Sequence, residues 1–417
     1  MAKAKGVLAG QMAGETIGEG LFVLPGQGNT LAVSTGDGIV VLDASGHAHA
    51  PGMIEDLRER TQAPVHAIVY SHGHNGYNAS VDLWDAHNRE RGEPAARRIA
   101  HRLVPARYAR YRETAELQAR MAAMQFPTRR TLEEIGAGFG LHDPTETFDD
   151  TLTLTVTTAG RRVEVIHAPS EVDDALALWL PDDGLLAAGA AAPGTTIPNI
   201  GTPLRTQRYT MRWAVTLERL AALEAERLLT EFGPLIEGRA AVREWLIETA
   251  NALRWLREEV VRRLNAGMNE REILADMTYP AAIFDKPWMA PTYGAPEYIV
   301  RDLYREENGW WDRNPTNLHP ASEAATAAAV WSAIDPPRVL ARARELAEAG
   351  EAQLALHVLD LIAGGPAGEP LAVEARRLKA ELCRSLAQTT TAFVSRSLYK
   401  TSANLLDQDA SSWTALS

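Results

Sequence analysis

The segment 65–74 constrains the fold and chemistry of this chain more than any other. Residues 65–70 read as a buried β-strand, and Ser71-His72-Gly73-His74 follows at once. Because His72 and His74 are one residue apart at a strand end, both imidazoles can reach a single point beyond the strand. Imidazoles that converge in this way are typical of metal sites. The motif therefore predicts a metal centre at one edge of a sheet.

The other strands and turns predict a layered α/β fold. An amphipathic helix is expected over 51–60, and the spacing from 83 to about 136 predicts a helical insertion. The turn Pro181-Asp182-Asp183-Gly184 indicates a hairpin between the last two predicted strands. Antiparallel pairs that alternate with helices favour an α/β sandwich over a doubly wound sheet. Besides 65–70, strands are predicted at 21–24, 30–33, 38–43, 151–156, 162–166, 175–180 and 184–188.

Helical spacing dominates from about residue 205. A long amphipathic helix is expected over 240–264, and the next begins at Asn269, with Glu272 three residues on as a capping box. After Pro336, helices split by glycines suggest stacked helical hairpins. We expect two domains, residues 1–238 with the insertion at about 83–136, and an all-α domain over 239–417.

Charge and composition exclude several classes of partner. The net charge is -12, which disfavours binding to nucleic acid or to an anionic membrane, because both need a positive surface. No apolar run approaches the ~20 residues of a membrane span, and the N-terminal apolar piece is too short for a signal peptide. We therefore expect a cytoplasmic protein without nucleic-acid or membrane partners.

A second polar cluster follows the predicted strand 162–166. It contains Glu171, Asp173 and Asp174, and a sandwich would bring its first carboxylate beside the histidines. The order of strands, the turn 70–74 and the turn Pro169-Ser170-Glu171 resemble the metallo-β-lactamase fold, in its alkylsulfatase branch. Residues 265–273, 293–294 and 309–320 resemble the alkylsulfatase dimerisation domain. The resemblance implies a metallo-β-lactamase αββα sandwich, then an all-α dimerisation domain that makes a homodimer.

The resemblance also implies a two-metal site of which this chain keeps only one half. The retained ligands are His72, His74 and Glu171. The positions of the other ligands hold Gly76, Tyr77, Ala190 and Leu235. Such a degenerate motif implies at most one ion, Zn or Fe(II), or none, since two histidines and one carboxylate bind either metal in other folds.

Further site residues are predicted around this half-site. Tyr77 stands where a ligand is expected and is a candidate proton donor or anion partner, while Asp173 and Asp174 are candidates for a base. The stretch 199–205 resembles the family's sulfate-binding segment, and its candidate substrate-binding residues are Asn199, Thr202 and Arg205. Arginine suits a sulfate, phosphate or carboxylate, so a small anionic substrate is expected.

Three functions stay open at this point. The resemblance implies a hydrolase of sulfate or related esters of a small anionic metabolite. A second hypothesis is a repurposed enzyme that performs an Fe(II)-dependent oxidation or a metal-free elimination or rearrangement. A third is a catalytically silent dimeric scaffold or binding protein.

Overall fold

Two units, each with its own core, make up the chain. The structure is a computed structural model, and it describes residues 10, 12, 14–126, 130–154, 160–408 and 416. The first unit contains the described residues within 1–115 and 136–309, and the second contains those within 116–135 and 310–417. The boundary expected after residue 238 stays a prediction.

The first unit is built on two mixed sheets. In the first sheet, neighbouring strands pair antiparallel from β1 to β4 and parallel from β4 to β7. In the second sheet, β11 and β12 pair in parallel, and all other neighbouring strands pair antiparallel. In spatial order the first sheet is β1(Glu15–Gly18), β2(Leu21–Gly26), β3(Gly28–Thr35), β4(Gly38–Leu42), β5(Val65–Val69), β6(Arg97–His101) and β7(Glu146–Phe148). The second is β13(Leu235–Glu237), β12(Arg227–Leu229), β11(Leu185–Ala187), β10(Leu176–Leu180), β9(Val163–His167) and β8(Thr151–Leu154).

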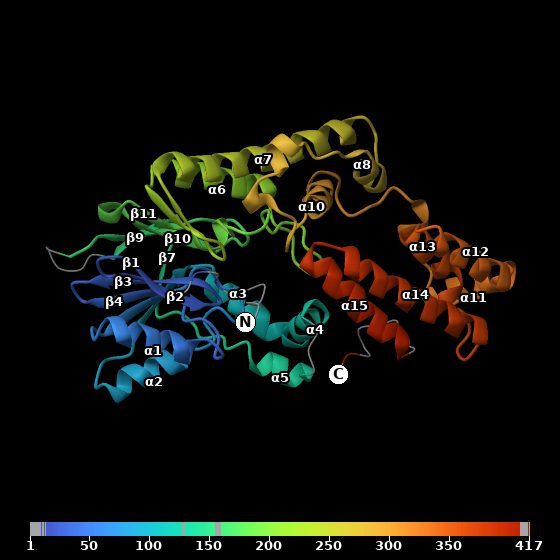
Figure 1. Cartoon of the computed structure of the whole chain (residues 1–417). Helices are drawn as coiled ribbons and strands as arrows, with labels where there is room; N and C mark the ends of the chain where they lie inside the picture. The colour runs from blue at the N-terminus through green and yellow to red at the C-terminus, as the bar shows by residue number, and fades with distance from the viewer. Residues whose placement is uncertain are drawn as a thin grey trace. The chain divides into compact units, whose positions relative to one another are not determined.

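The two sheets face each other and carry helices on their outer faces. Apolar side chains of both sheets, such as Val33 and Leu178, form one buried core between them. Helices α1(Ala50–Arg60), α2(Val81–Glu90) and α3(Val104–Glu113) share a core with the first sheet, whereas α6(Thr210–Ala221) and α7(Arg239–Asn265) share one with the second. Figure 1 shows α1 and α2 below the first sheet, and α6 and α7 above the second. The predicted αββα sandwich is thus confirmed.

Three predictions about individual elements can be compared with the structure. The capping box is confirmed, because the Asn269 side chain accepts from the Glu272 backbone and the Glu272 carboxylate accepts from the Asn269 backbone. The strand predicted over 151–156 is present over β8, and Thr155 and Val156 lie outside the described residues. The hairpin of β10 and β11 is confirmed.

The segment 83–136, for which a helical insertion was predicted, contains one strand besides its helices. Residues 97–101 form β6, which pairs in parallel with β5 and extends the first sheet. Its arginine- and alanine-rich sequence carries little intrinsic strand preference, so burial against a neighbouring strand decides its conformation. The mainly helical character expected from residue 205 likewise overlooked β12 and β13, whose three residues each are too few to show a period of two.

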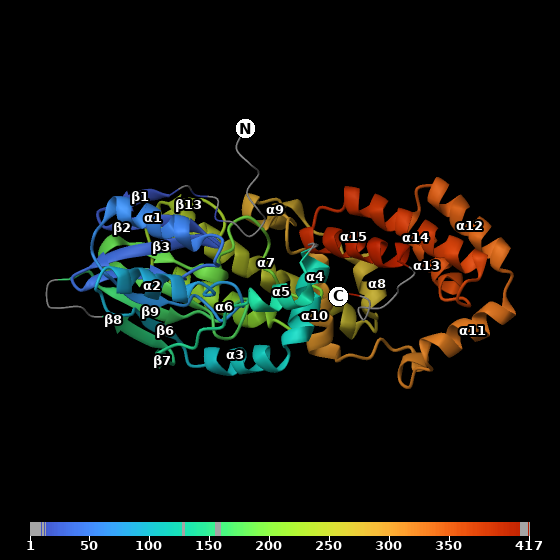
Figure 2. The ribbon, with the colours of Figure 1, turned by 90° about the horizontal axis from the view of Figure 1, so that it is seen from below.

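Helices complete both units. In the first unit, α8(Glu270–Asp276), α9(Ala281–Phe284) and α10(Pro296–Asn308) lie beyond α7. In the second, α4(Ala115–Gln125) lies beside α15(Phe393–Asp407), as Figure 2 shows. The Thr401 hydroxyl on α15 donates to the Met124 carbonyl on α4 at 3.1 Å. Between them in sequence are α5(Leu132–Ala137), α11(Glu323–Ala333), α12(Pro336–Glu348), α13(Ala352–Ala363) and α14(Pro370–Thr389). None of the helices in the described segments is both long and apolar enough to cross a membrane.

Candidate metal centre

The candidate centre forms where strand ends of the two sheets meet. The Leu176 amide at the start of β10 donates to the Ser71 carbonyl just after β5, at 2.8 Å. The Ser71 amide donates to the Asp43 carboxylate at 2.8 Å, and Asp43 follows β4. These two bonds fix the position of the turn that carries the histidine pair, and Asp43 was not predicted to take part.

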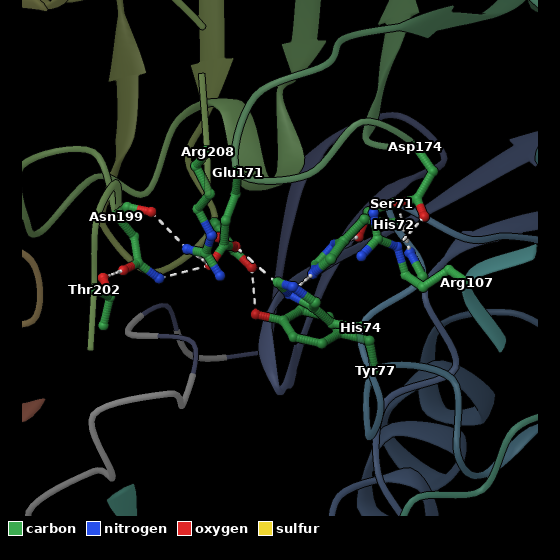
Figure 3. Close-up of polar contacts among 12 residues, drawn as sticks. Ser71, His72, His74, Tyr77, Arg107, Glu171, Asp174, Asn199, Thr202 and Arg208 are labelled. Atoms are coloured by element: carbon green, nitrogen blue, oxygen red, sulfur yellow. Dashed lines mark hydrogen bonds and ion pairs between the residues drawn. The ribbon is translucent and has the colours of Figure 1, made fainter. Parts of the chain in front are cut away.

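His72, His74 and Glu171 converge at this edge of the sandwich. The His72 Nε2 and His74 Nδ1 atoms are 2.9 Å apart, and His74 Nδ1 is 3.7 Å from Glu171 Oε2. One potential ligand atom from each of the three residues lies within 4.8 Å of the others. Figure 3 shows the two imidazoles directed toward the Glu171 carboxylate. The three ligands predicted from sequence are thus brought together.

The electrostatics of the cluster suit a metal ion. Burial lowers the pKa of His72, and it lowers the pKa of His74 well below its ordinary value. Burial thus favours the neutral form of both imidazoles, which is the form that binds metals. Two neutral imidazoles and one carboxylate match the donor set of Zn or Fe(II) centres that keep open positions. The Ser71 hydroxyl, 2.9 Å from His72 Nδ1, helps to fix the orientation of that ring.

Glu171 is held by two partners on the segment that precedes α6. Its Oε1 atom accepts from Asn199 Nδ2 at 2.6 Å and from Arg208 Nη1 at 2.5 Å. Arg208 also donates to the Asn199 carbonyl at 2.5 Å, and the Thr202 hydroxyl donates to Asn199 Oδ1. Because Oε1 takes these bonds, Oε2 is the oxygen that faces His74.

The arginine that contacts Glu171 is Arg208, which sequence reasoning missed. The predicted substrate-binding residue, Arg205, donates to the Leu204 carbonyl at 3.0 Å, and burial lowers its pKa. The two arginines are three residues apart in one irregular segment, where no helical or strand period shows which one faces the site. The ion pair with Glu171 identifies the role of Arg208.

Tyr77 and Glu231 form a buried pair beside the histidines. The Tyr77 ring centroid is 4.2 Å from that of His72, and the Tyr77 hydroxyl donates to Glu231 Oε1. Burial raises the pKa of both groups well above their ordinary values. The loop that carries Glu231 is positioned by Asn29, whose backbone amide donates to the Glu231 carbonyl at 2.6 Å. Glu231 lies just after β12. In the sequence, its position as an acidic residue after a strand was the feature that could have indicated a role in the site.

The other three positions of the missing half-site contribute no ligand. Gly76 has φ +92°, a backbone conformation that L side chains rarely adopt. Ala190 lies in the short 3₁₀-helix η2(Gly189–Ala191) and packs with Val172 and Ala175. Leu235 lies in β13, paired with Leu229.

Asp173 and Asp174 are both engaged by Arg107 from α3. The Arg107 guanidinium donates to one carboxylate oxygen of each residue. Asp174 is 0% exposed and also accepts from the Gly73 amide at 3.1 Å. A Cβ atom at Gly73 would come within 2.9 Å of the Arg107 side chain and 3.0 Å of Asp174, so a larger residue there would force these side chains to shift. Figure 3 shows Arg107 and Asp174 on the far side of His72 from Arg208. The catalytic role of the two aspartates stays a prediction.

Arg208 provides a direct test of the support around Glu171. We expect Arg208→Gln to lower metal affinity roughly 10- to 100-fold, because loss of a group that orients a ligand has effects of that size. Affinity is measured by competition with a chromophoric chelator. The matched control is Arg219→Gln, which removes an exposed arginine of α6 that pairs with Asp150. Equal affinities in the two variants would contradict the role assigned to Arg208.

The αββα sandwich carries the histidine pair just after β5, and known protein families can be compared with it on both features. Residues 23–231 match the metallo-beta-lactamase superfamily, and the chain belongs to that superfamily. Residues 269–409 match the alkyl sulfatase dimerisation family. Both resemblances drawn from the sequence are thus confirmed.

Individual relatives agree with this family assignment. The chain is 26% identical over 310 residues to a linear primary-alkylsulfatase of Pseudomonas sp., covering 70% of this chain and 58% of that protein. It is 24% identical over 244 residues to an (R)-specific secondary-alkylsulfatase of Pseudomonas sp., covering 57% and 35% respectively. The solved structure of the stereoselective inverting sec-alkylsulfatase Pisa1 from Pseudomonas sp. shares the fold, with a TM-score of 0.79 and 19% identity over 94% of this chain and 65% of that one. The chain thus spans less than two thirds of these relatives.

Proposed function

We propose that this chain is a sulfate ester hydrolase that acts on small organosulfates with one metal ion, of which zinc is the candidate. In the reaction, water cleaves the ester into an alcohol and hydrogen sulfate. The observation that carries the proposal is the convergence of His72, His74 and Glu171 within 4.8 Å of one another. The similarity to alkylsulfatases supports the choice of substrate class.

The residues around the cluster have distinct proposed roles. His72, His74 and Glu171 would hold the ion, which supplies Lewis acidity toward a substrate oxygen or water. Arg208 and Asn199 hold Glu171 in place. Within the segment that contains both, the half-buried Arg205 is the proposed contact for the sulfate group.

Tyr77 and the aspartates are proposed to shape the site. The Tyr77–Glu231 pair is proposed to occupy the side of the centre where the family resemblance expects a second ion. A hydrogen bond between these two side chains would then replace the ligands of that ion. Asp174 binds both Gly73 and Arg107, and these contacts favour a positioning role in the histidine turn. A site of this kind lacks the second ion that clamps attacking and leaving oxygens together.

Metal analysis and an activity assay test the proposed function together. Protein purified without chelators should contain about one zinc ion per chain, and it should release sulfate from short alkyl sulfates. Chelation should abolish that release and added zinc should restore it. Iron in place of zinc would support the Fe(II)-dependent oxidation instead. Metal-free protein without sulfatase activity would contradict the proposal and leave the scaffold hypothesis.

We also propose that the second unit mediates homodimer formation. The support is the match of residues 269–409 to the dimerisation family, a range that lies in this unit from residue 310 on. Further support is given by exposed apolar side chains of the unit, including Trp310 at 67% and Leu354 at 47% exposure. Sedimentation equilibrium should give twice the mass of one chain. A monomer at micromolar concentration would contradict this proposal.

A further inference from the structure

A pocket of about 340 Å³ adjoins the candidate metal centre. It lies between α3, the turn that follows Glu171 and the first residues of α6, all within the first unit. Glu171 itself lines the pocket, so a molecule whose ester reached the metal centre could extend into it. The charged residues in its lining are Arg107, Arg110, Glu171, Asp173 and Arg212.

Most of these charges are already paired. Arg107 is engaged by Asp173 and Asp174, and Glu171 is engaged by Arg208. Within the described segments, neither Arg110 nor Arg212 forms an ion pair with a carboxylate. The charge that is left uncompensated in this pocket is therefore positive.

Arg212 shows the strongest need for an anionic partner. Its Nε atom is buried and has no hydrogen-bond partner among the described residues. Its guanidinium lies 5.2 Å from the centre of the Tyr209 ring, which holds the group by a cation–π contact but accepts no hydrogen bond in the guanidinium plane. Burial lowers the pKa of Arg212, which shows that the environment disfavours its charge. A buried donor left unsatisfied costs free energy, and since Arg212 lines the pocket, an anion bound there would compensate the charge of its guanidinium.

The lining also distinguishes between classes of substrate tail. A pocket built for a long alkyl chain would be lined mainly by apolar side chains. Here Leu103, Ala106 and Val172 share the lining with three arginines. A guanidinium is planar and matches a carboxylate by two parallel hydrogen bonds.

We propose that this pocket, the arginine pocket, binds a second anionic group of the substrate through Arg110 and Arg212. The substrate class is then a short organosulfate that carries a carboxylate at the end opposite the sulfate ester. This inference rests on the proposed sulfatase function for the identity of the first group. The second group is assigned from the arginine pocket alone.

Binding of non-hydrolysable analogues tests the inference without requiring catalysis. The probes are pairs of alkanesulfonates of equal length, one ending in a carboxylate and the other in a methyl group, measured by isothermal titration calorimetry. We expect the carboxylate-ended probe to bind about tenfold more tightly, which corresponds to about 1.4 kcal/mol. Arg110→Gln and Arg212→Gln should each reduce this preference. The control is Arg243→Gln, an exposed arginine of α7 outside the pocket, which should retain it.

The outcomes separate this inference from the proposed function. A preference for the carboxylate in protein without sulfatase activity would support the arginine pocket and contradict the sulfatase. Sulfatase activity with equal or better binding of the methyl-ended probe would support the sulfatase and overturn the arginine pocket. Failure of both probes to bind, or a preference that survives in both arginine variants, would also overturn it.

Discussion

Replacement of His72 by alanine is expected to remove bound metal and to lower the rate of sulfate release by more than roughly 100-fold. Loss of a residue that merely orients a metal ligand lowers metal affinity or activity by up to about 100-fold, and loss of a ligand itself should have a larger effect. His72 is 0% exposed, and its Nε2 atom lies 2.9 Å from His74 Nδ1. Loss of one imidazole leaves two donors, His74 and Glu171, which is fewer than catalytic zinc sites use. The measurements are metal content by mass spectrometry and sulfate release.

A matched control and a second variant separate loss of metal from loss of fold. His47 belongs to another His-x-His sequence with His49, but it lies on the surface beside Asp82, so His47→Ala should keep metal and activity. Glu171→Gln keeps the size of the side chain and one acceptor oxygen for Asn199 and Arg208. It should lose metal. Because it also removes the anionic partner of the buried Arg208, its stability should fall as well, and near-ultraviolet circular dichroism at a temperature below its unfolding checks that the fold is kept while the metal is lost. Full metal content in both His72→Ala and Glu171→Gln would exclude this centre.

Replacement of Arg107 by alanine is expected to destabilise the first unit by about 3–5 kcal/mol, the usual cost of leaving one partner of a buried ion pair. Asp174 is fully buried and would lose its only cationic partner within the described residues. Among the described residues, the Gly73 amide would then be the remaining hydrogen-bond donor to its carboxylate. Urea unfolding followed by near-ultraviolet circular dichroism measures the change.

Another arginine on the same helix provides the comparison. Arg112 pairs with Asp143 at 2.7 Å, with side chains 46% and 54% exposed. Exposed pairs contribute about 0–1 kcal/mol, so Arg112→Ala should have little effect. If the two variants lost equal stability, the Arg107 cluster would have no special structural role. The double variant Arg107→Ala with Asp174→Asn should recover part of the loss, because the unpaired charge is then absent.

The sequence predicted the parts of the site that depend on neighbouring residues. His72 and His74 are recognisable because a strand and a two-residue spacing are enough to aim both rings at one point. Glu171 was found because its turn follows another strand of the sandwich. Local patterns of this kind also predicted the hairpin of β10 and β11 and the capping box at Asn269.

The residues that were missed depend on contacts between distant segments. Glu231 reaches Tyr77 across 154 positions, and Arg208 reaches Glu171 across 37. Neither residue lies in a periodic element, so nothing in its own surroundings indicates which way it points. The same reason explains why β6 was not predicted, because its conformation is determined by pairing with β5 rather than by its own composition.

The left-handed backbone at Gly76 limits how this site could be engineered into a two-metal enzyme. Aspartate at this position would have to adopt φ +92°, which strains any residue with a Cβ atom. Histidine in place of Tyr77 would remove the phenol that donates to the buried Glu231. Each ligand restored singly would therefore be destabilising before any second ion could bind. A successful redesign would have to rebuild the loop 75–77 and replace Glu231 in one step.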